Sequence, residues 1–306
     1  MSTHEFKPTK YYNTMGPHQP AIHIKDGDSV VTTTIDSHGY DQNLNKVSSS
    51  PNPMTGPFFV ENAEPGDTLA VTFEYMKPNR DTGFTGNIVA PHLVDPEEVK
   101  NLPEMDFLDW NLDMNKGKAT PIKPFSSMPN LQFDIEPFLG CFGVAPSRGE
   151  WITTESSAEH GGNMDYRGFQ TGTTAYFPVF EPGAYFFLGD SHARQGDGEI
   201  IATGIETSFE VKFKVRLIKG KTIGWPRGED EDYIFTIGNV RPLEMAIQHA
   251  TTEMLQWLND DYGLDKVAAS VLLGHCVEYD VGNVYNSAYT MVCKVPKSAL
   301  KMVEKK

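Results

Sequence analysis

The chain contains 306 residues, and its 41 acidic and 26 basic side chains give a formal net charge of −15 at pH 7. A chain this acidic repels phosphate backbones, and no basic stripe interrupts it, so we expect no nucleic acid among its partners. Its 39% of hydrophobic residues can build a sizeable core, and its 27 glycines and 21 prolines favour many short strands over long helices.

The sequence shows no segment that we would assign to secretion or to a membrane. Residues 1–20 are polar and lack the apolar stretch of a signal peptide, and the longest apolar runs are too short to cross a bilayer. The three cysteines, Cys141, Cys276 and Cys293, form an odd set without a CxxC pair. Such a set is typical of reduced thiols, so we expect a cytoplasmic protein with no membrane partner.

Strands dominate the first two thirds of the sequence. The clearest signal is residues 209–217, where apolar side chains alternate strictly with charged ones. A period of two with one charged face predicts a half-buried antiparallel strand. The other predicted strands cover residues 30–35, 68–75, 173–180 and 184–188, and a tight turn at 181–183 joins the last two.

Residues 91–130 interrupt this pattern with six prolines in a polar stretch. We expect a long surface excursion with little regular structure, which could act as a lid or as an oligomer contact. We assign residues 1–220, including this excursion, to a β-rich region that holds the functional site. Residues 221–306 then form a smaller α/β portion, and both are packed as one globular unit.

The last third of the chain predicts helices. Apolar residues recur at three- and four-residue steps from Leu243 to Leu258, and Pro242 suits the first turn of that helix. A second helix is predicted over residues 265–273, ending at Gly274, and a final strand over residues 288–295. We interpret the acidic segment 228–232 as a solvated loop, with a ligand role as the alternative.

Two glycine-rich segments concentrate groups that bind divalent metals. Residues 160–165 are HGGNMD, and residues 189–199 are GDSHARQGDGE. Glycine lets the backbone approach a ligand closely, and imidazole beside carboxylates is a common ligand set for such ions. The simpler alternatives are a glycine-rich turn at 160–165 and an ordinary hairpin at Asp197–Gly198. A bare turn has no need of Asp190, His192 and Glu199 together, so a metal site is our first hypothesis.

A third candidate, Asp36-Ser-His38, ends the predicted strand 30–35. Residues two apart on a strand share a face, so both side chains could reach one ion, although polar residues at a strand end are an equal alternative. The sequence contains no GxSxG nucleophile elbow and no HExxH helix. Cys141 has no neighbouring base, which indicates a buried and inert thiol. Metal-assisted hydrolysis is therefore the first chemistry to test.

These segments resemble the acetamidase/formamidase family, together with NPMTGP at 52–57, PGD at 65–67 and GCFGVAP at 140–146. The similarity runs in order from about Ala21 to Val295. It implies a mainly β fold, with sandwich-like and barrel-like parts and a smaller α/β portion. It also implies a homo-oligomer, a dimer or larger, with bound Zn²⁺ and with Ca²⁺ at a second site. The implied reaction is hydrolysis of a short aliphatic amide, of the formamide or acetamide class, to a carboxylate and ammonia.

The resemblance leads to a hypothesis for the site. Asp165 and His192 are its best metal ligands, and Asp36 matches the acidic strand end of the family pattern. Glu199 closes the site and serves as proton shuttle, with Glu150 as the alternative. A carboxylate in that position takes a proton from water and passes it to the amide nitrogen, which is otherwise a poor leaving group.

Further residues complete the hypothesis. Asn163 is expected to bind the substrate amide or the oxyanion, and Asp190, Asp197 or His38 to form the second, calcium site. For so small a substrate we expect a small apolar pocket, closed by residues 91–130. Two other functions remain open, namely the same chemistry on a different amide or imide and a non-catalytic β-sandwich whose metal only braces loops.

Overall fold

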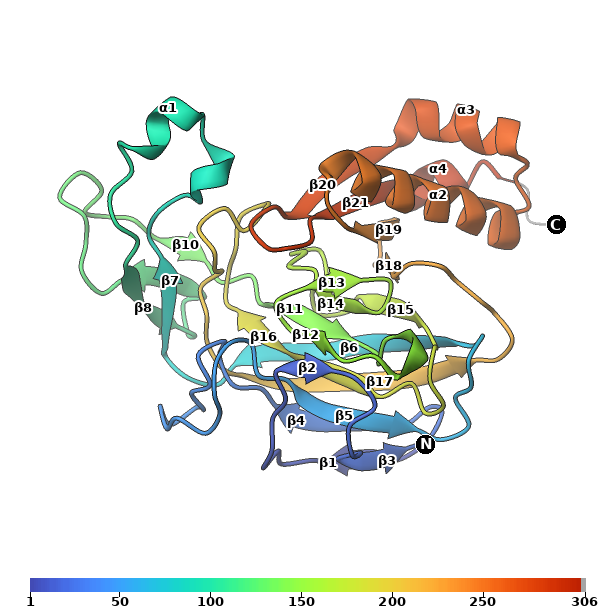
Figure 1. Ribbon diagram of the computed structural model, residues 1–306, viewed down its shortest axis with the longest axis horizontal. Helices are drawn as coiled ribbons and strands as arrows, with labels where there is room; N and C mark the ends of the chain where they lie inside the picture. The colour runs from blue at the N-terminus through green and yellow to red at the C-terminus, as the bar shows by residue number, and fades with distance from the viewer. Residues whose placement is uncertain (304–306) are drawn as a thin grey trace.

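The computed structural model describes residues 1–303 and shows two large β-sheets, a small sheet that projects from the body, and a helical layer (Figure 1). The larger sheet has nine strands, in the order β1 (Thr3–Glu5), β4 (Ser29–Thr33), β17 (Phe209–Ile218), β6 (Thr68–Pro78), β15 (Thr174–Pro178), β18 (Arg227–Glu229), β19 (Tyr233–Asn239), β21 (Thr290–Pro296) and β20 (Glu278–Asn283). The second sheet has six strands, in the order β13 (Ser157–Ala158), β14 (Gly161–Asn163), β11 (Phe138–Gly143), β16 (Phe186–His192), β5 (Thr55–Val60) and β3 (Ile22–Ile24).

The main core lies between these two sheets. Phe213 of β17 contacts Phe58 of β5 and Phe186 of β16, with ring centroids 5.1 and 5.2 Å apart. The predicted alternation in β17 is confirmed, because Phe209, Val211, Phe213 and Val215 are fully buried while the charged side chains between them keep some exposure. β17 pairs antiparallel with both β4 and β6. The expected sandwich is therefore present, and no sheet within residues 1–303 closes on itself.

The other predicted strands are found with shifted ends. The tight turn is present, since the Ala184 amide donates to the Glu181 carbonyl at 2.9 Å. The two strands that it connects do not pair with each other, because β15 belongs to the nine-stranded sheet and β16 to the six-stranded sheet. β16 also begins later than predicted and extends to His192. This extension carries two of the candidate site residues in a strand.

The prediction of little regular structure in residues 91–130 is wrong in part. The segment contains a hairpin, and its strands join a four-stranded sheet in the order β10 (Phe133–Asp134), β9 (Lys118–Pro121), β8 (Phe107–Asp113) and β7 (Thr82–Gly86). Asp113 closes the hairpin turn by accepting the amides of Asn115 and Lys116. Alternation of apolar and polar side chains in FLDWNLD at 107–113 outweighs the surrounding prolines.

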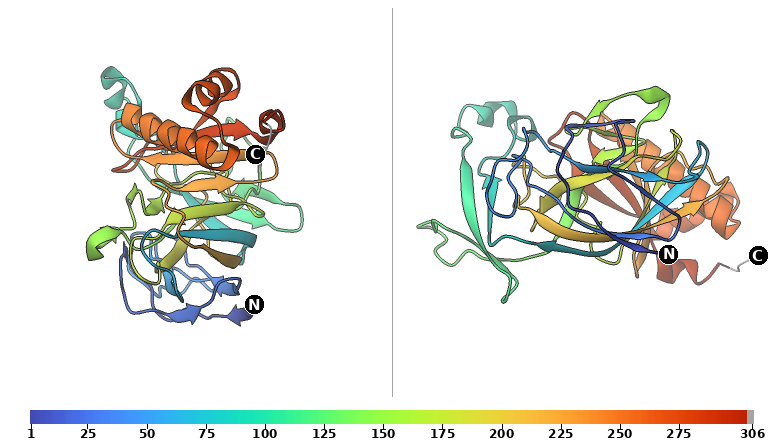
Figure 2. Two further views of the ribbon diagram at one scale, coloured as in Figure 1. Left: turned by 90° about the vertical axis from the view of Figure 1, so that its right-hand side faces the viewer. Right: turned by 90° about the horizontal axis from the view of Figure 1, so that it is seen from below.

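Two helices cover one end of the nine-stranded sheet (Figure 2). α2 (Leu243–Tyr262) follows Pro242 as predicted and buries Ala246, Ala250, Met254 and Leu258 on one stripe. α3 (Lys266–Cys276) begins after the capping side chain of Asp265 but continues through Gly274, contrary to the predicted end. The sequence analysis missed β20, and it placed Gly228 and Glu229 in a loop although they belong to β18.

The remaining short elements are a two-stranded ladder and several single turns of helix. They are β2 (Thr14–Met15), β12 (Ile152–Thr153), η1 (Pro91–Leu93), η2 (Ser147–Gly149), α1 (Pro96–Val99) and α4 (Lys297–Leu300). Within the described part of the chain, every helix is too short or too polar to cross a bilayer.

Candidate active site

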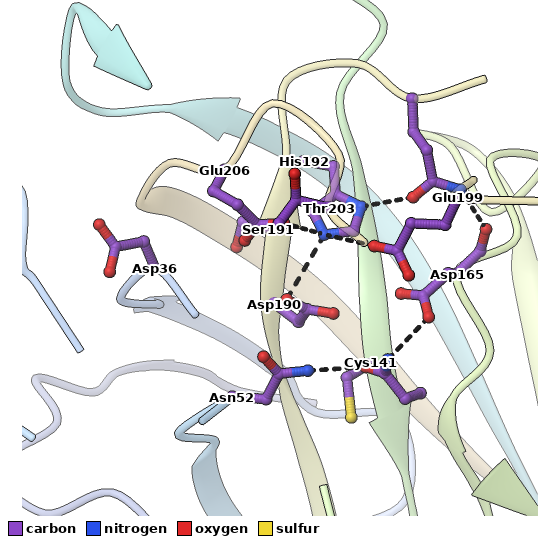
Figure 3. A network of polar contacts seen from close by, with 12 residues as sticks. Asp36, Asn52, Cys141, Asp165, Asp190, Ser191, His192, Glu199, Thr203 and Glu206 are labelled. Atoms are coloured by element: carbon purple, nitrogen blue, oxygen red, sulfur yellow. Dashed lines mark hydrogen bonds and ion pairs between the residues drawn. The ribbon is translucent and has the colours of Figure 1, made fainter. Parts of the chain in front are cut away.

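Five acidic and imidazole side chains meet in the interior beside the six-stranded sheet (Figure 3). They form two overlapping groups, each with ligand atoms within 4.8 Å of one another, and His192 belongs to both. None of the five residues is more than 4% exposed. The first group is Asp165, Asp190 and His192, and the second is His192, Glu199 and Glu206.

The cluster is built from several separate segments. Asp190 and His192 lie two residues apart on β16, and Asp165 follows β14, which joins the same sheet through β11. Glu199 lies in the loop after β16. Glu206 comes just before β17 and is joined to His192 by an isolated bridge. A strand of the six-stranded sheet, the loop after it, the residue that follows β14 and the segment before β17 thus contribute to one site.

The backbone at three of these residues is held in an uncommon conformation. Asp165, Asp190 and Glu199 have φ values of 47°, 53° and 51°, in the left-handed region that residues with a side chain seldom adopt. Each such residue costs on the order of 1–3 kcal/mol, and such residues cluster at functional sites. The left-handed backbone at these three residues therefore supports a functional site here.

Gly140 of β11 provides the space in which the carboxylates meet. Its carbonyl accepts the amides of Met164 and Asp165, both at 3.0 Å. A Cβ at this position would lie 2.7 Å from Asp190 Oδ2 and closer still to Asp165 Oδ1. Since real Cβ atoms do not make contacts this short, only glycine fits beside the cluster as it stands.

Gln195 fixes the orientation of the His192 ring. The Gln195 side-chain oxygen accepts from His192 Nδ1 at 2.8 Å, and its amide nitrogen donates to the Asp165 carbonyl at 2.8 Å. The ring proton is therefore assigned to Nδ1, which directs Nε2 toward the carboxylates.

Three carboxylate oxygens surround the other ring nitrogen. His192 Nε2 lies 2.8 Å from Glu206 Oε1, 3.4 Å from Asp190 Oδ1 and 3.9 Å from Glu199 Oε1. Burial opposes protonation of this ring, but the charges of Glu206 and Asp190 outweigh burial and raise the pKa of His192. In the absence of another cation, the protonated ring would be the carboxylates' counter-charge.

The carboxylates are far from water and close to one another. Burial raises the pKa of Asp165, and the Asp190 charge raises it further. Burial likewise raises the pKa of Glu199, with the Asp165 charge as the next cause. Two carboxamides offset part of this cost, because Asn163 and Asn283 donate to Asp165 Oδ2 at 2.7 and 2.6 Å, and Asn283 also donates to Glu199 Oε2 at 2.7 Å.

Several buried atoms of the cluster lack a hydrogen bond. Within residues 1–303, Asp165 Oδ1, Glu206 Oε2 and His192 Nε2 have no partner of ordinary hydrogen-bond geometry. A buried carboxylate oxygen without a donor is costly, and a cation would satisfy such atoms. The donor set, carboxylates with one imidazole, is one that divalent metals accept. The residues present therefore fit a metal ion.

The structure places Asp36 outside both groups. Its Oδ1 accepts the amides of His38 and Tyr40 at 3.1 and 2.9 Å, and its Oδ2 accepts from Arg80 Nη2 at 2.8 Å. Asp36 and Arg80 are both buried, and Figure 3 shows Asp36 apart from the His192 cluster. The predicted convergence of Asp36 with Asp165 and His192 is therefore not observed, because an arginine already neutralises Asp36.

The Asp36–Arg80 ion pair allows a test of whether Asp36 stabilises the fold or binds a metal ion. Asp36→Asn leaves buried Arg80 without its counter-charge, so we expect the free energy of unfolding to fall by about 3–5 kcal/mol. Denaturant unfolding measures this loss. The metal content of the folded variant should equal that of the parent. Loss of metal without loss of stability would instead make Asp36 a ligand.

Three other predicted residues also lie outside the cluster. The ring of His38 stacks on Phe84, with centroids 4.3 Å apart. Asp197 is exposed and pairs with Arg167, and Glu150 is exposed just after η2. The predicted calcium group of Asp190, Asp197 and His38 is not formed. The side chain of His38 contacts Phe84 and that of Asp197 contacts Arg167, so neither reaches Asp190. Glu150 is too exposed for the proton shuttle that Glu199 could provide.

Asn163 and Cys141 lie against the cluster in different ways. The Asn163 amide donates to Asp165, and its oxygen accepts from Asn52 at 2.9 Å. Both ends are thus occupied within the protein. Cys141 is fully buried, as predicted; burial raises the pKa of its thiol, and the Asp190 charge raises it further.

Sequence reasoning missed Glu206, Asn283 and the role of Gln195. Glu206 lies three residues before the alternating strand that begins at Phe209, and its position ahead of a confident strand is a weak signal. Asn283 ends β20, a strand that was not predicted. Gln195 lies inside the glycine-rich segment 189–199, but nothing in the segment indicates that it binds His192.

A mainly β fold of two packed sheets with a buried carboxylate and histidine centre defines the class of this protein. The sequence profile of the Acetamidase/Formamidase family matches residues 7–150 and 149–296, and the chain belongs to that family. The match covers the six-stranded sheet, every strand of the nine-stranded sheet except β1, and all five residues of the cluster.

Solved structures and curated sequences agree with this membership. An acetamidase structure from Yersinia enterocolitica is 30% identical, with a TM-score of 0.83 over 97% of this chain and 93% of that chain. A structure of a predicted acetamidase/formamidase from Thermoanaerobacter tengcongensis is 26% identical, with a TM-score of 0.85 over 99% and 98%. A formamidase from Methylophilus methylotrophus is 27% identical over 209 residues, 54% of this chain and 51% of that protein. The chain spans about half the length of the curated relatives that it matches.

Proposed function

We propose that this protein hydrolyses primary carboxamides with a divalent metal ion held by the cluster. Water and the amide RCONH₂ give the carboxylate RCOO⁻ and NH₄⁺, with cleavage of the C–N bond. The observation that carries this proposal is the convergence of Asp165, Asp190 and His192 in a buried group with unpartnered ligand atoms. Membership in the Acetamidase/Formamidase family supports the amide as substrate.

Asp165, Asp190 and His192 would hold the ion, with Glu206 beside them. A bound zinc ion supplies Lewis acidity, which polarises an amide carbonyl and makes water a better nucleophile. Zinc is the ion that we propose, and calcium is the alternative that the excess of carboxylates over imidazole keeps open. Gln195 keeps the His192 proton on Nδ1, so that the lone pair of Nε2 remains available.

Glu199 is the residue that we propose to move the proton. Asn283 donates to its Oε2 at 2.7 Å and so fixes that oxygen, which leaves Oε1 to take a proton from water and return it to the amide nitrogen. Burial raises the pKa of Glu199, which favours a carboxyl that can hold the proton between the two transfers. Asn163, with both ends of its amide occupied, orients Asp165.

Removal of metal tests this function. We expect chelator to abolish ammonia release from formamide and acetamide, and added Zn²⁺ to restore it. Elemental analysis of the freshly purified protein gives the ion and its stoichiometry. Full activity in protein shown to be free of metal would contradict the mechanism. Metal that raises the melting temperature without any amide hydrolysis would instead support a bracing role.

A further inference from the structure

A cavity of about 390 Å³ lies beside the cluster, between residues 194–205 and the small projecting sheet. The cavity and the cluster share a wall. Glu199 lines the cavity, and its Oε1 lies 3.9 Å from His192 Nε2. Gln195 and Gly204 line it too; Gln195 binds the His192 ring, and Gly204 packs against that ring. The cavity therefore adjoins the proposed proton shuttle, Glu199, which is 4% exposed.

The rest of the wall is largely apolar. It is formed by Trp110 and Phe133 of the small sheet and by Ile200, Ile201 and Ile205 of the facing loop. The two threonines in the lining, Thr85 and Thr203, have their hydroxyls 3.0 Å from each other.

The charged side chains in the lining are already paired. Arg194 is engaged by Glu136 at 3.1 Å and by the Asp134 carbonyl at 2.9 Å, and Asp197 by Arg167. Apart from the groups next to His192, the lining therefore offers a ligand mainly carbon atoms.

The cavity is far larger than formamide or acetamide requires. A water-sized group occupies about 30 Å³ in a liquid, so 390 Å³ has room for on the order of ten non-hydrogen atoms. A formamide molecule would leave most of the apolar wall uncovered. Burial of apolar surface favours binding by about fourfold for each methylene, and formamide and acetamide offer almost none of it.

We propose that this cavity holds the apolar acyl group of the substrate, and that the preferred substrates are primary amides of medium-chain or arylalkyl carboxylic acids. This inference rests on the proposed amide hydrolysis and adds the substrate class. The amide group lies at the Glu199 end, and an acyl group of about six to ten carbons fills the space toward Trp110 and Ile205.

A substrate series tests the size preference with the purified, metal-replete protein. Ammonia release is measured for formamide, acetamide, butyramide, hexanamide and phenylacetamide. We expect kcat/KM to rise through the series by at least about 10²-fold, consistent with about fourfold for each buried methylene. A kcat/KM that is highest for formamide or acetamide would overturn the inference and leave amide hydrolysis standing. If no amide is hydrolysed, the proposed function fails and the inference fails with it.

Variants of the cavity wall test the location. Ile201→Phe places a larger ring in the cavity, so the ratio of kcat/KM for hexanamide to that for acetamide should fall at least about tenfold. Ile200→Phe, at a side chain that is 43% exposed, provides the same test at lower risk to folding. Ile122→Phe is the matched control, since Ile122 is 53% exposed and does not line the cavity. An unchanged ratio in the folded cavity variants would overturn the assignment.

Discussion

In the Asp165→Asn variant we expect amide hydrolysis to fall by more than the ~10–100-fold that is typical when a residue behind a metal ligand is changed. Asparagine keeps the shape of the side chain and one oxygen to accept from Asn163 and Asn283. It removes the charge of Asp165 Oδ1, a buried oxygen that has no hydrogen-bond partner in residues 1–303. The measurements are ammonia release and bound metal per folded protein.

For the same variant we predict that stability, unlike hydrolysis, does not fall. In chelator, Asp165→Asn should unfold at a temperature equal to or above that of the parent, because one of several mutually repelling buried carboxylates is gone. Asp109→Asn, an exposed position on β8, is the control and should change neither property. Parent-level hydrolysis by folded Asp165→Asn protein would remove Asp165 from the chemistry.

Gly140→Ala should have an effect of similar size by a steric route. The added Cβ would lie 2.7 Å from Asp190 Oδ2 and 2.9 Å from His192 Cε1, so the cluster must move apart. We expect hydrolysis to fall by at least about 10²-fold, as misplaced catalytic groups do, and stability by about 1–3 kcal/mol. Kinetics and denaturant unfolding measure the two effects.

Gly274→Ala is the matched control for this substitution. Gly274 lies inside α3, and its added Cβ would meet nothing within 4 Å. Alanine is the better helix former, so this variant should be slightly more stable and equally active. If Gly140→Ala behaves like the control, the space beside Asp165 and Asp190 is not required as we describe it.

The part of the site that lies within one glycine-rich stretch was predictable from sequence. Asp190, His192 and Glu199 occur within ten residues, and a strand places the first two on one face. Glu206 and Asn283 reach the same cluster through the pairing of β16 with its neighbours and through β20. Such contacts depend on how sheets pack, which the local pattern does not contain.

Asp36 shows how a correct prediction from the local sequence can still give the wrong interaction partner. Asp36 does follow a strand and its side chain is buried, as expected of a ligand. Its partner is Arg80, which follows β6 and is 44 residues away in sequence. Nothing in the residues around Asp36 distinguishes an arginine partner from a metal ion.

The fold was predictable where the period of two is strong, as in β17. The fold was less predictable where proline or glycine suggested the absence or the end of a strand or helix. Prolines suggested an irregular excursion over residues 91–130, whereas FLDWNLD forms β8 of a hairpin. Gly274 suggested a helix end, but α3 continues through it to Cys276 because the next turn still completes its hydrogen bond from Val277 to Leu273.

The two hydrogen bonds from Asn283 also constrain when the centre can form during biosynthesis. A ribosome delivers Asp165, Asp190, His192, Glu199 and Glu206 well before residue 283 leaves the exit tunnel. Until then the carboxylates of Asp165 and Glu199 lack the amide that links them. The nascent chain therefore passes through a stage in which all five side chains of the cluster have been made but the Asn283 amide has not, so the complete hydrogen-bonded cluster forms only after β20 has been synthesised.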